Sequence, residues 1–234
     1  MSSFEVRGVR VNRAELAIVR QVDLAVESGR VSVLLGANGA GKTTFLEGLS
    51  GVIPLAGGTV ALDGMALHNI SAGRRARAGL AHVEQGRTVF RQLTAEENLQ
   101  VGRHPEARLQ EAYDLFPELS ARRSVRAGLL SGGEQQMLVI ARALLGRPKV
   151  ILIDEMSAGL APVVVGRLMQ AVRRLADAGL AVVLVEQFAA LALAIGDRAY
   201  VMRRGEMVYD GGCDALRQSP DDLHRLYLGE APPA

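Results

Sequence analysis

The sequence has few of the features that mark secreted or membrane-spanning proteins. Cys213 is the single cysteine, so no internal disulfide can form, and a reducing cytosol is the compartment that fits. The N-terminus has no apolar signal region. The most apolar window, residues 180–195, is interrupted by Glu186 and Gln187 and is too short to span a bilayer. We therefore expect a soluble chain that reaches a membrane only through a partner.

Lysine is also scarce, and the charge pattern gives no sign of a nucleic-acid partner. Lys42 and Lys149 are the only lysines, and the net charge is +2. The arginines are scattered singly and in pairs, which favours solvated faces over a nucleic-acid stripe. Because 49% of the 234 residues are hydrophobic, the chain can still bury a sizeable core. The histidines show no metal-ligand spacing: His68, His82, His104 and His224.

A glycine-rich stretch predicts a phosphate-binding loop. Residues 31–35 predict a buried strand, residues 43–50 predict a helix, and the Gly-x4-Gly-Lys-Thr pattern of a P-loop stands between them. Glycines let the N–H groups point at phosphate oxygens, and the helix N-terminus adds about half a positive charge. Lys42 would contact the β- and γ-phosphates, and Thr43 would bind Mg²⁺. The other residues expected at the phosphates are Gly36, Asn38, Gly39, Ala40, Gly41 and Thr44.

Two further stretches carry the residue types that hydrolysis needs. The apolar run that begins at residue 150 ends in Asp154 and Glu155. A carboxylate at the end of such a strand can hold Mg²⁺ through water, and the next one, Glu155, can accept a proton from the attacking water. Ser131, Gly132 and Gly133 at a predicted helix start would form a second anion site. Taken alone, these three residues favour an ordinary serine N-cap with flexible glycines.

The remaining pattern predicts an α/β chain with an antiparallel-rich N-terminal part and a helical insertion. A capping box at Thr94 and Glu97 predicts a helix start, and no strand is expected between residues 87 and 130. The other strands are expected at residues 4–11, 22–26, 59–62, 79–83, 150–154 and 181–185, with two more within 196–207. The other helices are expected at residues 71–78, 106–116, 131–145 and 162–178, and after a cap at residues 219–222.

Together and in this order, the three motifs resemble the ATP-binding-cassette (ABC) ATPases over nearly the whole chain. The resemblance implies an α/β P-loop NTPase fold with a mixed sheet, an antiparallel β part and an inserted helical subdomain. It implies one domain, residues 1–230, followed by a tail at 231–234. Residues 1–86 and 148–230 would form the RecA-like core with the antiparallel part, and residues 87–147 the helical subdomain.

The resemblance also implies cofactors, partners and residue roles. ATP and Mg²⁺ would bind at a dimer interface, where Ser131, Gly132 and Gly133 of one subunit contact the γ-phosphate held by the P-loop of another. Gln85 would bind Mg²⁺ together with Thr43 and the water-linked Asp154. Residues 157–160 resemble the loop that touches the opposite site, and residues 87–90 begin the part that docks onto a permease.

Three positions depart from the family pattern. Met156 stands where proline usually follows the catalytic glutamate, and we expect a tolerated loop change. An adenine-stacking aromatic residue is missing from residues 11–14. Arg13 could stack there instead, or it could simply face solvent. Gln187 replaces the family's switch histidine. It can donate a hydrogen bond to the γ-phosphate but carries no charge, which leaves Glu155 as the base.

The residues in and around the motifs are similar to those of the importer ATPase subunits for branched-chain amino acids. This implies a peripheral protein at the cytoplasmic face of the membrane, with permease subunits, a second ABC ATPase in a homo- or heterodimer, and an extracytoplasmic substrate-binding protein. The segment between Gly102 and Glu106 is shorter than usual. Importers of urea or other amides have similar subunits, and a regulatory subunit with weak hydrolysis is a further alternative. Cassettes that act on nucleic acid or ribosomes usually carry tandem cassettes or long insertions, and neither is present here.

Overall fold

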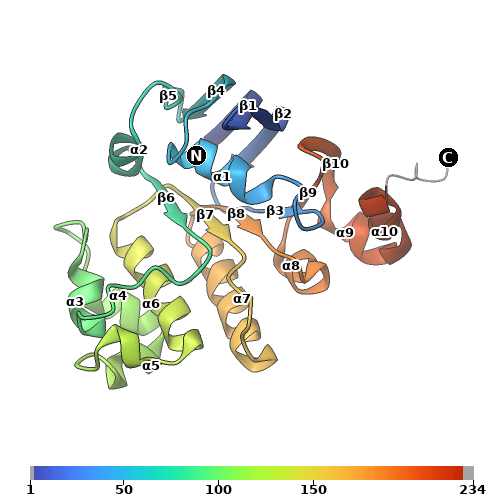
Figure 1. Ribbon diagram of the computed structural model, residues 1–234. Coiled ribbons are helices and arrows are strands. Elements are labelled where there is room, and N and C mark those ends of the chain that lie inside the picture. The colour runs from blue at the N-terminus through green and yellow to red at the C-terminus, as the bar shows by residue number, and fades with distance from the viewer. Residues whose placement is uncertain (1–2, 229–234) are drawn as a thin grey trace.

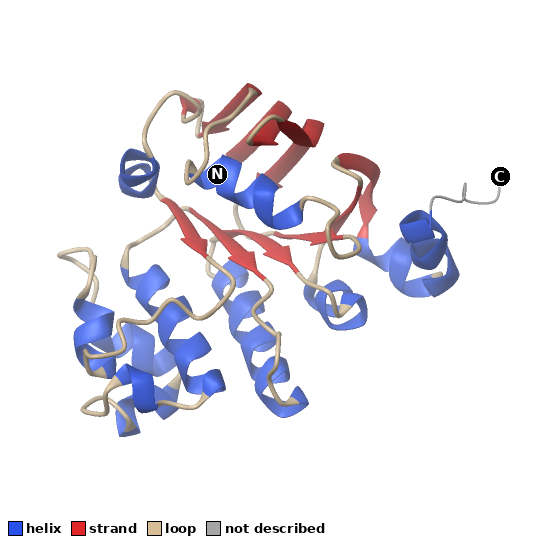
Figure 2. Ribbon diagram, viewed as in Figure 1, coloured by secondary structure: helices blue, strands red, loops and turns tan. Residues whose placement is uncertain are grey.

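The computed structural model describes residues 3–228, which form two sheets with one helix between them and further helices on the far face of the larger sheet (Figures 1 and 2). The smaller sheet is antiparallel, in the order β2-β1-β4-β5. Its strands are β1 (Ser3–Arg13), β2 (Leu16–Glu27), β4 (Gly57–Leu62) and β5 (Met65–Ala66).

The larger sheet has six strands in the order β10-β9-β3-β8-β7-β6. Every neighbouring pair in it is parallel except the hairpin of β9 and β10. Its strands are β3 (Val31–Leu35), β6 (Leu80–Val83), β7 (Val150–Asp154), β8 (Ala181–Val185), β9 (Arg198–Arg203) and β10 (Glu206–Gly212). The carboxyl ends of the parallel strands therefore meet at one edge, where ligands of open α/β sheets bind.

Helices cover both faces of this sheet. α1 lies between the two sheets, while α6, α7 and α8 lie on the opposite face (Figure 1). In chain order the helices are α1 (Lys42–Ser50), α2 (Ala72–Ala78), α3 (Ala95–Gln100), α4 (Leu109–Leu115), α5 (Pro117–Ala121), α6 (Gly132–Leu145), α7 (Pro162–Asp177), α8 (Ala189–Ile195), α9 (Cys213–Gln218) and α10 (Pro220–Leu228). A single 3₁₀ turn, Ala127–Leu129, precedes α6.

The continuous apolar strands divide the core into two clusters. Successive side chains of a strand point to opposite faces. In β3, Val33 and Leu35 therefore pack with α6 and α7, whereas Leu34 packs with α1 and the antiparallel sheet. All five residues of β3, of β7 and of β8 are buried, as expected for strands covered on both faces.

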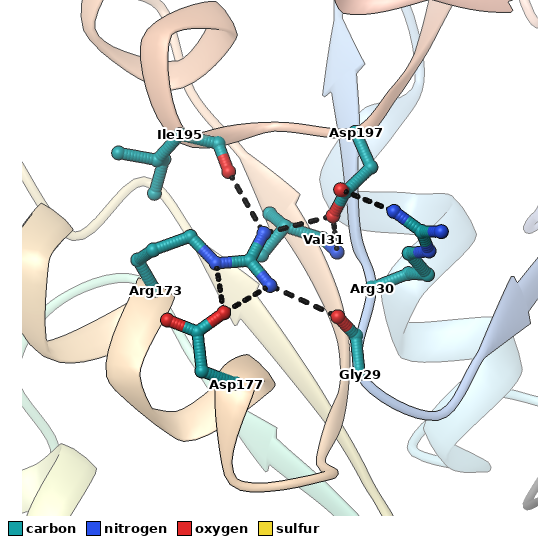
Figure 3. A network of polar contacts seen from close by, with 7 residues as sticks. All are labelled: Gly29, Arg30, Val31, Arg173, Asp177, Ile195 and Asp197. Carbon is teal, nitrogen blue, oxygen red and sulfur yellow. Dashed lines mark hydrogen bonds and ion pairs between the residues drawn. The ribbon is translucent and has the colours of Figure 1, made fainter.

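An ion-pair network ties α7 to the edge of the sheet opposite the P-loop (Figure 3). Arg173 donates to Asp197 Oδ2 at 2.8 Å and to the Gly29 carbonyl at 2.9 Å. The same Asp197 oxygen accepts the Val31 N–H at 2.8 Å. Burial raises the pKa of Asp197, but the hydrogen bonds from Val31, Arg173 and Arg30 outweigh it and hold the pKa below its usual value. The network thus fixes where β3 and β9 begin.

The structure confirms most predicted elements and corrects several. Residues 87–147 contain only helices and turns, apart from an isolated bridge between Thr94 and Arg126. The predicted helix at 106–116 begins only at Leu109. It ends at Leu115, before Pro117, which begins the unpredicted helix α5 because proline suits the first helical turn. β2 is longer than predicted, and β5, α8 and α9 were not predicted. The tail at 231–234 lies outside the described residues.

Candidate nucleotide-binding site

The P-loop occupies the carboxyl end of β3, as its sequence predicts. It leads into α1, whose N-cap is Gly41 with φ 109°. Gly36 has φ 153°, and a Cβ at that position would come within 2.3 Å of the Met202 carbonyl oxygen. Only glycine fits both demands, because a left-handed φ and a close backbone approach exclude other side chains. The loop and its neighbours line a cleft of about 460 Å³.

Lys42 lies at the floor of this cleft. Its side chain is 4% exposed, and Nζ donates to the carbonyls of Gly36 at 2.8 Å and Ala37 at 3.2 Å. Burial lowers the pKa of Lys42, while Glu155 and Asp154 act in the opposite direction. The ammonium group therefore makes hydrogen bonds to the loop itself, at the point where phosphate oxygens can replace the carbonyls.

Glu155 is the point where the predicted catalytic residues meet. Gln85 Nε2 donates to Glu155 Oε2 at 2.8 Å, and Gln187 Nε2 donates to the same oxygen at 3.1 Å. The other oxygen, Oε1, lies 3.8 Å from Lys42 Nζ. Glu155 has φ 45°, a conformation that is uncommon for a residue other than glycine and that is found preferentially at functional sites. Residues from three loops after β6, β7 and β8 thus converge on one carboxylate.

Asp154 could hold a hydrated metal ion beside the P-loop. Its carboxyl group is buried, and neither oxygen accepts a hydrogen bond of good geometry. Burial raises its pKa to about 6, and the nearby Thr43 hydroxyl and Lys42 oppose that shift. An orphaned buried carboxylate beside a hydroxyl suits Mg²⁺, which prefers oxygen ligands and keeps several waters. Among residues 3–228 no group of three or more His, Cys, Asp or Glu side chains is placed so that it could hold a metal ion by itself.

Arg13 lies at the outer end of the same cleft and does not point freely into solvent. Its Nε donates to Thr44 Oγ1 at 3.0 Å, and its Nη2 forms an ion pair with Glu47. These two in-plane bonds fix the guanidinium and leave its faces available for stacking. Sequence reasoning missed Glu47, which lies 34 positions from Arg13 and had no motif to mark it.

The residues predicted to act on a second subunit are separate from this cleft. Ser131 caps α6 by accepting the Glu134 N–H, and Glu134 returns the bond in a capping box. Neither Ser131 nor the two glycines that follow lines the P-loop cleft. Arg87 joins this motif to residues 157–160, because it packs against Gly132 and donates to the Ala158 carbonyl at 2.8 Å.

The fold accommodates Met156, one of the residues that differ from the family pattern. Met156 is 1% exposed and packs in the core cluster beneath α6 and α7, so the proline is replaced by an apolar anchor. Sequence reasoning did not single out Glu186 as a site residue. Its carboxylate is completely buried and accepts hydrogen bonds from both the N–H and the hydroxyl of Ser157. The only signal in the sequence is a charge placed directly after five apolar residues.

The chain is similar to known proteins along most of its length. The family model for ABC transporters matches residues 19–158. The high-affinity branched-chain amino acid transport ATP-binding protein BraG of Pseudomonas aeruginosa is 39% identical over 221 residues, which cover 92% of this chain and 94% of BraG. The probable branched-chain amino acid transport ATP-binding protein LivF of Archaeoglobus fulgidus is 34% identical over 95% of this chain and 98% of its own length.

The fold is shared with solved cassettes as well. A crystal structure of a nucleotide-free ATP-binding cassette from an ABC transporter superposes with a TM-score of 0.86 at 24% identity, and the match covers 98% of this chain and 100% of that cassette. The family match spans more than half of the chain and includes the P-loop, Asp154 at the end of β7 and the adjacent Glu155. The chain therefore belongs to the ABC transporter family, as a subunit that binds and hydrolyses ATP.

Proposed function

We propose that this chain powers an importer of branched-chain amino acids from the cytoplasmic face of the cell membrane. The matches to relatives named for that transport cover nearly the whole chain. The residues of the motifs between positions 85 and 187 resemble those of the same group. No helix within residues 3–228 is long and apolar enough to cross a membrane. The path for the amino acid would then be supplied by permease subunits and an extracytoplasmic binding protein.

The convergence of Gln85, Gln187 and Lys42 on Glu155 is the observation that carries the catalytic assignment. In this proposal Glu155 accepts the proton of the water that attacks the γ-phosphate. Lys42 leaves the loop carbonyls and contacts the β- and γ-phosphates. Gln187 donates its amide hydrogens to a γ-phosphate oxygen or to Glu155, so it orients groups but does not transfer a proton.

The remaining site residues bind the nucleotide and the metal ion. Backbone N–H groups of the P-loop from Gly36 to Thr44 would hold the phosphates. Thr43, Gln85 and the water-linked Asp154 would hold Mg²⁺, which supplies charge neutralisation on the phosphates when bound. Arg13, fixed by Thr44 and Glu47, would stack on the adenine.

A second cassette would complete the site. Ser131, Gly132 and Gly133 lie outside the P-loop cleft of their own chain, which is consistent with action on the nucleotide of a partner. The exposed N-terminus of α6 provides N–H groups and the positive end of the helix for a γ-phosphate. The partner could be a second copy or a different ABC ATPase.

The helical part, residues 87–147, would dock onto the permease. A groove of about 810 Å³ runs between the strand β6 and the side formed by α6 and residues 101–105, which follow α3. Arg77, Arg103 and Arg142 line it, and Arg142 is stacked on the ring of Phe90 at 4.9 Å. Phe90 itself is 48% exposed, so an apolar and basic surface is presented together. A short amphipathic cytoplasmic helix of a permease fits such a surface.

Co-purification from solubilised membranes tests the proposed complex. A tagged chain should bring down two permease subunits, a second ATPase or a second copy of itself, and, on addition, a periplasmic-type binding protein. The reconstituted complex should take up leucine, isoleucine and valine with ATP inside the vesicle. Uptake of urea or amides instead would identify the alternative substrate class, and turnover absent even in the full complex would favour a regulatory subunit.

A further inference from the structure

Glu186 is a charged side chain in the interior of the molecule that the catalytic scheme leaves unused. It follows β8 directly, and its relative exposure is 0%. The Ser157 N–H donates to Glu186 Oε1 at 3.2 Å, and the Ser157 hydroxyl donates to Oε2. The carboxylate therefore accepts from both hydrogen-bond donors of Ser157, which lies on the loop that follows β7.

Burial of the Glu186 carboxylate costs folding free energy that a side chain with only a packing role would not cost. Among residues 3–228 no arginine or lysine forms an ion pair with Glu186, and Glu155 acts on it as a like charge. Burial raises the pKa of Glu186, and hydrogen bonds from the Ser157 hydroxyl and backbone, and from the Gln187 backbone, only partly offset this. Burying a carboxylate without a cation is unfavourable unless strong donors compensate for the lost hydration. An apolar residue would fill the same space at less cost.

The position of this contact links it to the catalytic residues. Ser157 stands two residues after Glu155, and Glu186 stands one residue before Gln187. The two loops are joined by three hydrogen bonds in addition to the strand ladder: Ser157 to Glu186 twice, and Gln187 to Glu155 once. The Glu155 N–H also donates to the Val185 carbonyl at 3.0 Å. These hydrogen bonds hold the loop after β7 against the loop after β8, and the Glu155 carboxylate takes part in one of them.

We propose that Glu186 is a positioning residue for hydrolysis, which acts by holding Ser157 and thereby fixing the orientation of Glu155 and Gln187 relative to each other. The proposal rests on the role of Glu155 given above. Ser157 is 2% exposed and Met156 is 1% exposed, so both residues are anchored in the interior. A shift of Ser157 is therefore transmitted through Met156 to Glu155. Displacing a reacting group by about 1 Å can cost about 100-fold in rate.

Steady-state kinetics of the full chain with its partner subunits test this role. Glu186→Gln keeps the shape but replaces one of the two acceptor oxygens with an amide N–H₂, so one of the two Ser157 donors loses its acceptor. It should lower kcat about 10- to 100-fold while the Kd for ATP changes less than about twofold. Glu186→Asp, whose carboxylate cannot reach as far, should lower kcat as well. Glu27→Gln, which removes an exposed carboxylate at the end of β2, should leave kcat unchanged.

A double-variant cycle separates positioning from general damage. Ser157→Ala should lower kcat, and the Glu186→Gln/Ser157→Ala pair should be no slower than Glu186→Gln alone, because both changes break the same contact. Additive losses, or a fall in kcat matched by weaker ATP binding and a lower melting temperature, would overturn the proposal. Glu155→Gln serves as the reference. If Glu155→Gln retains turnover, the catalytic assignment fails. If it abolishes turnover while Glu186→Gln is fully active, only the positioning role fails.

Discussion

Gln187 Nε2 donates to Glu155 Oε2 at 3.1 Å, so the residue that replaces the family's histidine is bonded to the proposed base. The same oxygen accepts Gln85 Nε2, and the other oxygen lies beside Lys42. Glutamine keeps its amide hydrogens at every pH and cannot accept a proton from the reaction. In the proposed mechanism Gln187 therefore makes an orienting contact, and proton transfer falls to the carboxylate.

Removing the Gln187 amide should slow hydrolysis without preventing ATP binding. Gln187→Ala loses a hydrogen bond to a charged group, worth about 1.5–3 kcal/mol, so kcat should fall about 10- to 100-fold. Gln187→Glu, which places a like charge beside Glu155, should be at least as slow. Steady-state ATPase assays of the complex measure this, with Gln21→Ala on the exposed face of β2 as the control. Full activity in Gln187→Ala would show that its bond to Glu155 has no catalytic weight.

Lys42 should matter for binding before it matters for chemistry. Lys42→Ala removes the ammonium that lies at the floor of the P-loop cleft, and ATP affinity should fall about tenfold or more. Equilibrium binding of a labelled ATP analogue checks this. Lys149→Ala is the matched control, because Lys149 is the only other lysine and pairs with Asp63 at the surface. An unchanged ATP affinity in Lys42→Ala is incompatible with the contact proposed for it.

The Arg173 network should contribute to stability and not to ATP binding. Arg173→Met keeps the length of the apolar stem but removes the guanidinium that donates to Asp197 and to the Gly29 carbonyl, while Val31 and Arg30 still donate to Asp197. Loss of these charged hydrogen bonds at a half-buried site should cost about 2 kcal/mol of unfolding free energy. Urea denaturation measures the change. Arg74→Met, in the exposed part of α2, should cost much less.

His82 should make the chain sensitive to mild acid. Burial lowers its pKa from 6.5 to about 4, while in the unfolded chain it returns to the ordinary value. Between these two values the unfolded state binds a proton that the folded state does not. Stability should therefore fall as the pH drops from about 6.5 to about 4, and be unaffected by this group at higher pH. His82→Asn should flatten that part of the stability profile in urea denaturation, whereas exposed His224→Asn should not. An identical slope in His82→Asn and the parent chain would contradict the assignment.

Local signals account for what the sequence predicts well. Short motifs predict the P-loop, the helix that follows it and the strand that ends in Asp154. Their signals are continuous apolar runs and glycines at positions where only glycine fits. The capping boxes at Thr94 and Ser131 lie within one helical turn and are both present. Such features need no knowledge of the tertiary fold.

The features that the sequence could not predict depend on contacts between distant segments. Arg13 and Glu47 meet because β1 packs against α1, and neither residue alone indicates the pair. Ser157 and Glu186 meet because β7 and β8 are neighbours in the sheet. α8 was missed because its short apolar sequence lacks polar caps, and α5 was missed because a proline that ends one helix can also begin the next.

ATP turnover by Glu155→Gln, measured in the complete transporter, tests the central claim most directly. The glutamine keeps the shape and the partners at Gln85 and Gln187 but cannot accept a proton. The account predicts that kcat falls about 100-fold or more, while ATP still binds and holds the two cassettes together in a stable dimer. Turnover within about threefold of the parent chain would contradict it, because the attacking water would then be activated by another group.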